Sequence, residues 1–184
     1  MKQACIEKTG VEENKILVIP PAINIVPKKF FSYENMSIPT FIYPANPIIY
    51  KNHQIIIDAC KQLAAEGITT FQVLFTLTGK ENKLSRKLFE QTEKHGLPIK
   101  FIGSIPREEL FELYTKAILI FPSCIETFGL PLLEAKMHGT PIIVADMLFV
   151  KEILSDFPCV HFYKFNEDIN SLNKMLKSYI KRAS

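Results

Sequence analysis

From residue 40 onward, apolar and polar positions alternate in blocks with two different periods. Short apolar runs that predict strands occupy residues 40–43, 71–79, 99–103, 117–123, 141–146 and 159–163. Stretches with apolar residues at helical spacing predict helices at 52–67, 82–95, 106–116, 129–139, 147–154 and 167–181. Gly67 is placed to end the first of these helices, and Pro106 to begin the third.

This strict alternation predicts an α/β fold, a Rossmann-like doubly wound parallel sheet with helices on both faces. In such sheets ligands bind beyond the carboxyl ends of the strands. We therefore expect a ligand to contact the loops at 44–52, 78–81, 102–106 and 122–130. Residues 40–184 are predicted to form this domain, and the proline-rich residues 1–39 to form an interdomain linker or arm.

The composition limits the class of protein but does not indicate a particular reaction. The 184 residues, 47% hydrophobic and 22% charged, suit one folded domain. A net charge of +3 is too small to indicate a nucleic-acid surface but permits an anionic small ligand. Four widely spaced cysteines without a C-x-x-C predict reduced thiols, as in a cytoplasmic protein. No apolar run approaches the ~20 residues that span a bilayer, and the polar start is unlike a signal peptide.

Candidate chemistry is concentrated where the predicted strand at 117–123 leads into the predicted helix at 129–139. A Phe-Gly turn there leaves the amides of Phe128, Gly129 and Leu130 available to one anionic or hydroxylated ligand at a helix N-terminus. Glu126 precedes this turn and Glu134 follows it. Carboxylates accept hydrogen bonds from sugar and ribose diols, so both glutamates are candidate ligand contacts.

The string "FPSCIETFGLPLLEAKMHGTPIIVAD" resembles the signature of retaining GT-B glycosyltransferases of family 4, also called glycosyl transferases group 1. The similarity covers roughly residues 40–180 and corresponds to the C-terminal donor-binding domain of the GT-B fold. It implies a hexosyltransferase that moves a sugar from a nucleotide-diphosphate sugar to an acceptor hydroxyl with retention, in surface polysaccharide or glycoconjugate synthesis. By this resemblance Glu126 contacts the sugar, Glu134 the ribose, and the amides of Thr127 to Leu130 the sugar and diphosphate.

The loop "YPANPIIYKNHQIIIDA" resembles the family segment in which a basic pair meets the diphosphate. Lys51 holds the lysine position, beside a predicted helix start. Asn46 stands where the family commonly has arginine, and a neutral amide does not replace a guanidinium. The resemblance also implies that the loops of Gly79 and Gly103 cradle the base, although a glycine at a strand end is by itself an ordinary turn residue.

No metal or cofactor is expected besides the nucleotide-sugar substrate. The chain has no D-x-D pair, and its four histidines lack metal-ligand spacing, so they are interpreted as packing or surface residues. The resemblance implies that the chain is a fragment whose partner is a missing N-terminal acceptor domain. We expect any peripheral membrane association to go through that absent domain.

Two alternatives remain at this point. A non-catalytic nucleotide-sugar-binding module that works with a partner chain is favoured by Asn46. A glycoside hydrolase using Glu126 and Glu134 as its acid and its nucleophile or base ranks lower. The carboxylates of such an enzyme flank a glycosidic bond, whereas a turn suited to bind phosphate lies between these two. A dinucleotide-binding dehydrogenase is set aside, because no G-x-G-x-x-G motif follows any predicted strand of this chain. The base, sugar and acceptor stay open.

Overall fold

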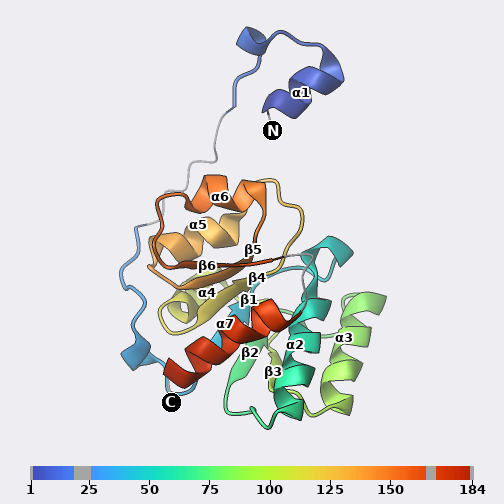
Figure 1. The fold of residues 1–184 in the computed structure, drawn as a ribbon, viewed down its shortest axis with the longest axis vertical. Helices are drawn as coiled ribbons and strands as arrows, with labels where there is room; N and C mark the ends of the chain where they lie inside the picture. Colours follow the sequence, from blue (N-terminus) through green and yellow to red (C-terminus); the bar gives the residue numbers. More distant parts are fainter. Residues whose placement is uncertain (1, 19–25, 165–168, 183–184) are drawn as a thin grey trace.

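The computed structural model describes residues 2–18, 26–164 and 169–182, and it contains a six-stranded parallel sheet in the order β3-β2-β1-β4-β5-β6 (Figure 1). The strands are β1 (Thr40–Tyr43), β2 (Gln72–Phe75), β3 (Ile99–Phe101), β4 (Ile118–Phe121), β5 (Ile142–Ala145) and β6 (Val160–Tyr163). This order confirms the predicted Rossmann-like doubly wound sheet.

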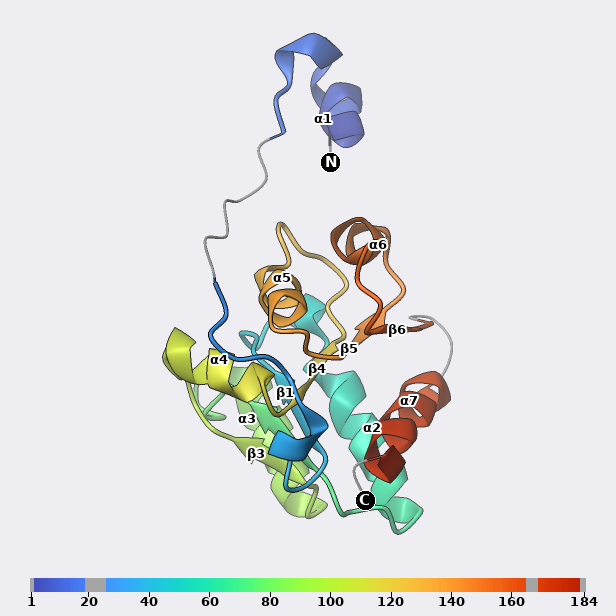
Figure 2. The same cartoon turned by 90° about the vertical axis from the view of Figure 1, so that its left-hand side faces the viewer.

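Six helices follow the strands as the periodicity predicts. They are α2 (His53–Ala65), α3 (Lys83–Lys94), α4 (Arg107–Tyr114), α5 (Leu130–Met137), α6 (Leu148–Leu154) and α7 (Ile169–Arg182). Residues 167 and 168, predicted to begin the last helix, lie outside the described residues. Because βαβ crossovers are right-handed, α2 and α3 cover one face, and α4, α5 and α6 cover the other; α7 packs against α2 (Figure 2).

Strands β1, β4 and β5 are buried along their whole length, which explains why their sequences are continuous apolar runs without alternation. Several strands are shorter than predicted, because the apolar runs continue into the loops that follow them. Residues 76–79 and 122–123, for example, belong to the predicted strands and lie beyond the ends of β2 and β4.

The first 39 residues contain structure that the hydrophobic pattern did not predict. Lys2–Thr9 form helix α1, and short 3-10 turns lie at Glu13–Lys15 and Tyr33–Asn35. Beyond the residues left undescribed at 19–25, the segment from 26 onward packs along the domain, with the Phe31 and Ser32 amides bonded to the His138 and Thr115 carbonyls at 2.8 and 3.1 Å. No helix within the described ranges is long and apolar enough to cross a membrane.

The sheet has a topological switch point between β1 and β4. From β1 the chain proceeds outward to β2 and β3, and it returns through α4 to β4 on the other side of β1. The loops that leave β1 and β4 therefore diverge toward opposite faces and leave a crevice between them, where doubly wound folds bind ligands.

Candidate active site

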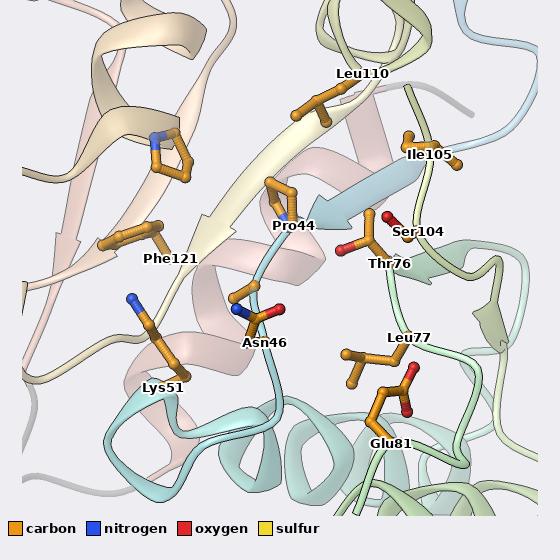
Figure 3. A pocket seen from close by; sticks show the side chains of 12 residues that line it. Pro44, Asn46, Lys51, Thr76, Leu77, Glu81, Ser104, Ile105, Leu110 and Phe121 are labelled. Atoms are coloured by element: carbon orange, nitrogen blue, oxygen red, sulfur yellow. The ribbon is translucent and has the colours of Figure 1, made fainter. Parts of the chain in front are cut away.

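A cavity of about 340 Å³ opens at the carboxyl ends of β1 to β4 (Figure 3). Three of the four loops expected to meet a ligand line it directly, and the fourth borders it through Phe121 and Pro131. The lining residues are Pro44, Ala45, Asn46, Lys51, Thr76, Leu77, Glu81, Ser104, Ile105, Leu110, Phe121 and Pro131. The described structure thus places a concave site at the predicted edge of the sheet.

Lys51 and Glu126, which come from the loops after β1 and β4, form an ion pair at the switch point. Their side chains are only 17% and 12% exposed, so water screens this pair less than a surface pair. The two loops are also joined by a hydrogen bond of 2.9 Å from the Cys124 amide to the Tyr50 carbonyl. Two residues singled out separately in the sequence therefore meet in space.

Lys51 is held by the way its loop turns into α2. It ends a 3-10 turn at Ile49–Lys51, and the following Asn52 adopts left-handed backbone angles with φ of 53°. The Tyr43 hydroxyl, at the end of β1, donates to the Lys51 carbonyl at 2.6 Å. The strand end thus fixes the backbone that carries the ammonium group.

His53, the first residue of α2, packs as a neutral aromatic ring against the ends of β1 and β2 beside this loop. Its ring lies 4.6 Å from that of Tyr43 and 5.2 Å from that of Phe75 between centroids, and neither nitrogen has a hydrogen-bond partner among the described residues. Burial, together with the nearby Lys51 charge, lowers the pKa of His53 to about 4. This agrees with the interpretation of His53 as a packing residue.

His53 should make the domain less stable in mild acid. The unfolded chain, with a histidine pKa of about 6.5, binds a proton that the folded chain excludes down to about pH 4. Protonation therefore favours the unfolded state, and the folded state loses stability as the pH falls from about 6.5 to about 4. We expect the free energy of unfolding to drop by about 2 kcal/mol more between about pH 7 and pH 5 in the native chain than in His53→Leu. Parallel pH profiles in urea denaturation would contradict this.

The turn before α5 has the open amides that the sequence suggested. Gly129 is the N-cap of α5 with φ of 61°, and Pro131 lies in the first helical turn. A Cβ at Gly129 would lie 2.9 Å from the Ile153 Cδ1, so both backbone angle and space favour glycine there. Among the described residues the backbone amides of Phe128, Gly129 and Leu130 donate to no acceptor. The side chains of Phe128 and Leu130, on either side of Gly129, are about half exposed.

Glu134 lies on the side of α5 that faces α4, and it is 8% exposed. Arg107, the first residue of α4, donates from Nε and Nη2 to the same Glu134 oxygen at 3.1 and 2.8 Å. Neither Glu134 nor Arg107 lines the 340 Å³ cavity. The sequence analysis missed Arg107, although its place just after the expected ligand loop at 102–106 could have drawn attention to it.

Of the remaining predicted residues, Asn46 lines the cavity, and Gly79 and Gly103 belong to loops that line it through Glu81 and Ser104. Asn46 is exposed and lies between Lys51 and the loop after β2 (Figure 3). Gly79 and Gly103 have φ of 80° and 75°, as strand-end turns require. Glu81, not predicted, also lines the cavity; partial burial raises the pKa of its carboxyl, but hydrogen bonds, chiefly from Thr78, outweigh this and lower it to about 2.

The sheet order and the switch-point cavity define a Rossmann-like domain whose ligand edge carries an ion-paired lysine and a turn of open amides. A sequence model of the family described as "Glycosyl transferases group 1" matches residues 27–183. The chain belongs to this family.

Curated relatives agree with this membership. The chain is 30% identical over 108 residues to the O-antigen chain mannosyltransferase B of Escherichia coli. The aligned segment covers 58% of this chain and 28% of that protein. It is 39% identical over 59 residues to the O-antigen chain mannosyltransferase RfbU of Salmonella typhimurium, covering 32% and 17%. The matched segments thus span less than a third of these relatives.

Solved structures share the fold at low identity. WaaG, a glycosyltransferase involved in lipopolysaccharide biosynthesis, superimposes with a TM-score of 0.74 at 19% identity, over 97% of this chain and 51% of that one. Sucrose-phosphate synthase from Thermosynechococcus elongatus gives 0.77 at 18%, over 99% and 47%. The chain therefore has the architecture of about half of each of these proteins.

Proposed function

We propose that this chain is the donor-binding domain of a retaining, family 4 GT-B glycosyltransferase, and that its cavity binds a nucleotide-diphosphate sugar. The observation that carries the proposal is the meeting of Lys51 and Glu126 at the switch point, beside a helix N-terminus with open amides. Cation, carboxylate and amides are the groups needed for a diphosphate that bears a sugar.

In the proposed reaction the glycosidic bond to the diphosphate breaks, and negative charge develops on the leaving phosphate. The Lys51 ammonium and the amides of residues 128–130 oppose that charge, so the transition state gains more than the bound donor does. Glu126 accepts hydrogen bonds from the sugar, and Glu134 from the ribose. The positive charge comes from the chain itself, and the proposal includes no metal ion.

The acceptor hydroxyl attacks the face from which the diphosphate departs, which retains the anomeric configuration. In this proposal the acceptor is held by a further domain outside this chain, in the cytoplasm, and the product is a surface polysaccharide. The O-antigen mannosyltransferases among the relatives support that product and make mannose the first sugar to test.

The geometry argues against the hydrolase alternative. Each carboxylate is paired with its own cation, Lys51 for Glu126 and Arg107 for Glu134. A glycosidase needs both carboxyl groups facing one glycosidic bond. In the proposed function the two glutamates contact different parts of an extended ligand.

Calorimetric titration of the chain with GDP, UDP and ADP, and with GDP-mannose and UDP-glucose, tests the proposal. We expect saturable binding of one nucleoside diphosphate with a stoichiometry of about one, and tighter binding of a sugar conjugate of the same base. Absence of binding to all five compounds by the folded chain would contradict it.

A further inference from the structure

We infer that Arg107 is a positioning residue that holds the Glu134 carboxylate in the orientation required to bind the ribose hydroxyls of the donor. This inference rests on the proposed function and assigns a role within the same site to a residue outside the family motif used above. The observations that carry it are the form of the Arg107–Glu134 contact, its burial, and the groups that surround it.

The contact uses only one of the two carboxylate oxygens. Two of the three guanidinium nitrogens of Arg107, Nε and Nη2, donate to Oε1 of Glu134 at 3.1 and 2.8 Å. A parallel fork would occupy both oxygens and leave the carboxylate saturated. Here both guanidinium hydrogen bonds go to Oε1, so Arg107 fixes the carboxylate through one oxygen and leaves Oε2 able to accept from a ligand hydroxyl.

The guanidinium is itself held in place. Arg107 is the first residue of α4, and its guanidinium lies 5.2 Å from the ring centroid of Phe111, one turn further along the same helix. This cation–π contact sets the direction of a long side chain that is 54% exposed. Arg107 therefore reaches from the solvent side over a carboxylate that is only 8% exposed.

A buried hydroxyl lies beside the pair. The Tyr114 side chain is fully buried next to Glu134. Burial raises the pKa of the Tyr114 hydroxyl, and the charge of Glu134 and a side-chain interaction with that carboxylate raise it further, so the hydroxyl stays protonated as a donor. Because protein encloses it, this hydroxyl faces the carboxylate rather than a ligand and helps to fix Glu134.

A purely structural role for Arg107, neutralising a buried carboxylate, makes a different prediction. Its loss would lower the stability of the fold, and any effect on a nucleotide would be independent of the ribose hydroxyls. A positioning role instead couples Arg107 to those hydroxyls. Comparison of ribonucleotides with deoxyribonucleotides separates the two roles.

The experiment titrates native chain, Arg107→Ala, Arg107→Lys and the exposed control Arg86→Ala with GDP and 2′-deoxy-GDP, and with UDP and 2′-deoxy-UDP in parallel. Thermal unfolding of each variant verifies that it is folded. Native chain and Arg86→Ala should prefer the ribonucleotide about tenfold. Arg107→Ala should weaken ribonucleotide binding about ten- to hundredfold and lose that preference, with Arg107→Lys in between.

Each outcome decides between the proposals. If folded Arg107→Ala keeps the preference for ribose, or binds ribonucleotides as tightly as the native chain, Arg107 does not position Glu134, and the proposed function survives. If the native chain binds neither these four nucleotides nor ADP, both proposals are contradicted; if it binds ADP alone, the comparison is made with ADP and 2′-deoxy-ADP.

Discussion

Replacing Lys51 by alanine is expected to weaken binding of the cognate nucleoside diphosphate by about ten- to hundredfold. Lys51 brings an ammonium group to the switch-point cavity, with its side chain 17% exposed. A charge-assisted bond to phosphate at such a site is screened less than a surface contact. The neighbouring Asn46 offers no positive charge to replace it.

The measurement is calorimetric titration of Lys51→Ala beside Lys94→Ala, which removes an exposed lysine in the last turn of α3, at the opposite edge of the sheet. The control should bind like the native chain. Equal affinities of native chain and Lys51→Ala would show that the diphosphate does not meet Lys51.

Replacing Glu126 by alanine is expected to raise the affinity for the nucleoside diphosphate and to abolish the advantage of the nucleotide sugar over it. In the ligand-free chain the Glu126 carboxylate is the partner of Lys51 and competes with phosphate for its ammonium. Its removal frees the cation and takes a like charge away from the diphosphate, so the nucleoside diphosphate should bind up to about tenfold more tightly. The sugar conjugate loses its proposed partner, and its advantage over the bare diphosphate should disappear.

Titration of Glu126→Ala with both ligands gives this comparison directly, and the double variant with Lys51→Ala strengthens it. Because the two side chains are in contact, their effects on diphosphate affinity should be non-additive. The gain from Glu126→Ala should vanish when Lys51 is absent. An unchanged preference for the sugar conjugate in Glu126→Ala would contradict the role of Glu126.

The strands, the helices and the ligand edge could be predicted because each depends on local patterns. Buried parallel strands are apolar throughout, as in Ile118–Phe121, and turn residues such as Gly129 identify the ends of elements. Helix α1 was missed because most of its described side chains are exposed and it lacks the apolar stripe from which helices are recognised.

Contacts between distant segments could not be read from the sequence. Lys51 and Glu126 are 75 residues apart, and they meet only because β4 pairs with β1 rather than with β3. The pairing of Arg107 with Glu134 likewise depends on α4 and α5 lying on the same face of the sheet. Strand order, a property of the whole chain, determines both contacts.

A crystal structure of the chain with its bound nucleoside diphosphate would show whether Lys51 and the amides before α5 hold a diphosphate at the switch point. We expect phosphate oxygens about 2.7–3.1 Å from the Lys51 Nζ and from amide nitrogens of residues 128–130, with the ribose at Glu134. A nucleotide bound elsewhere, with the Lys51–Glu126 pair intact and the amides unoccupied, would contradict it.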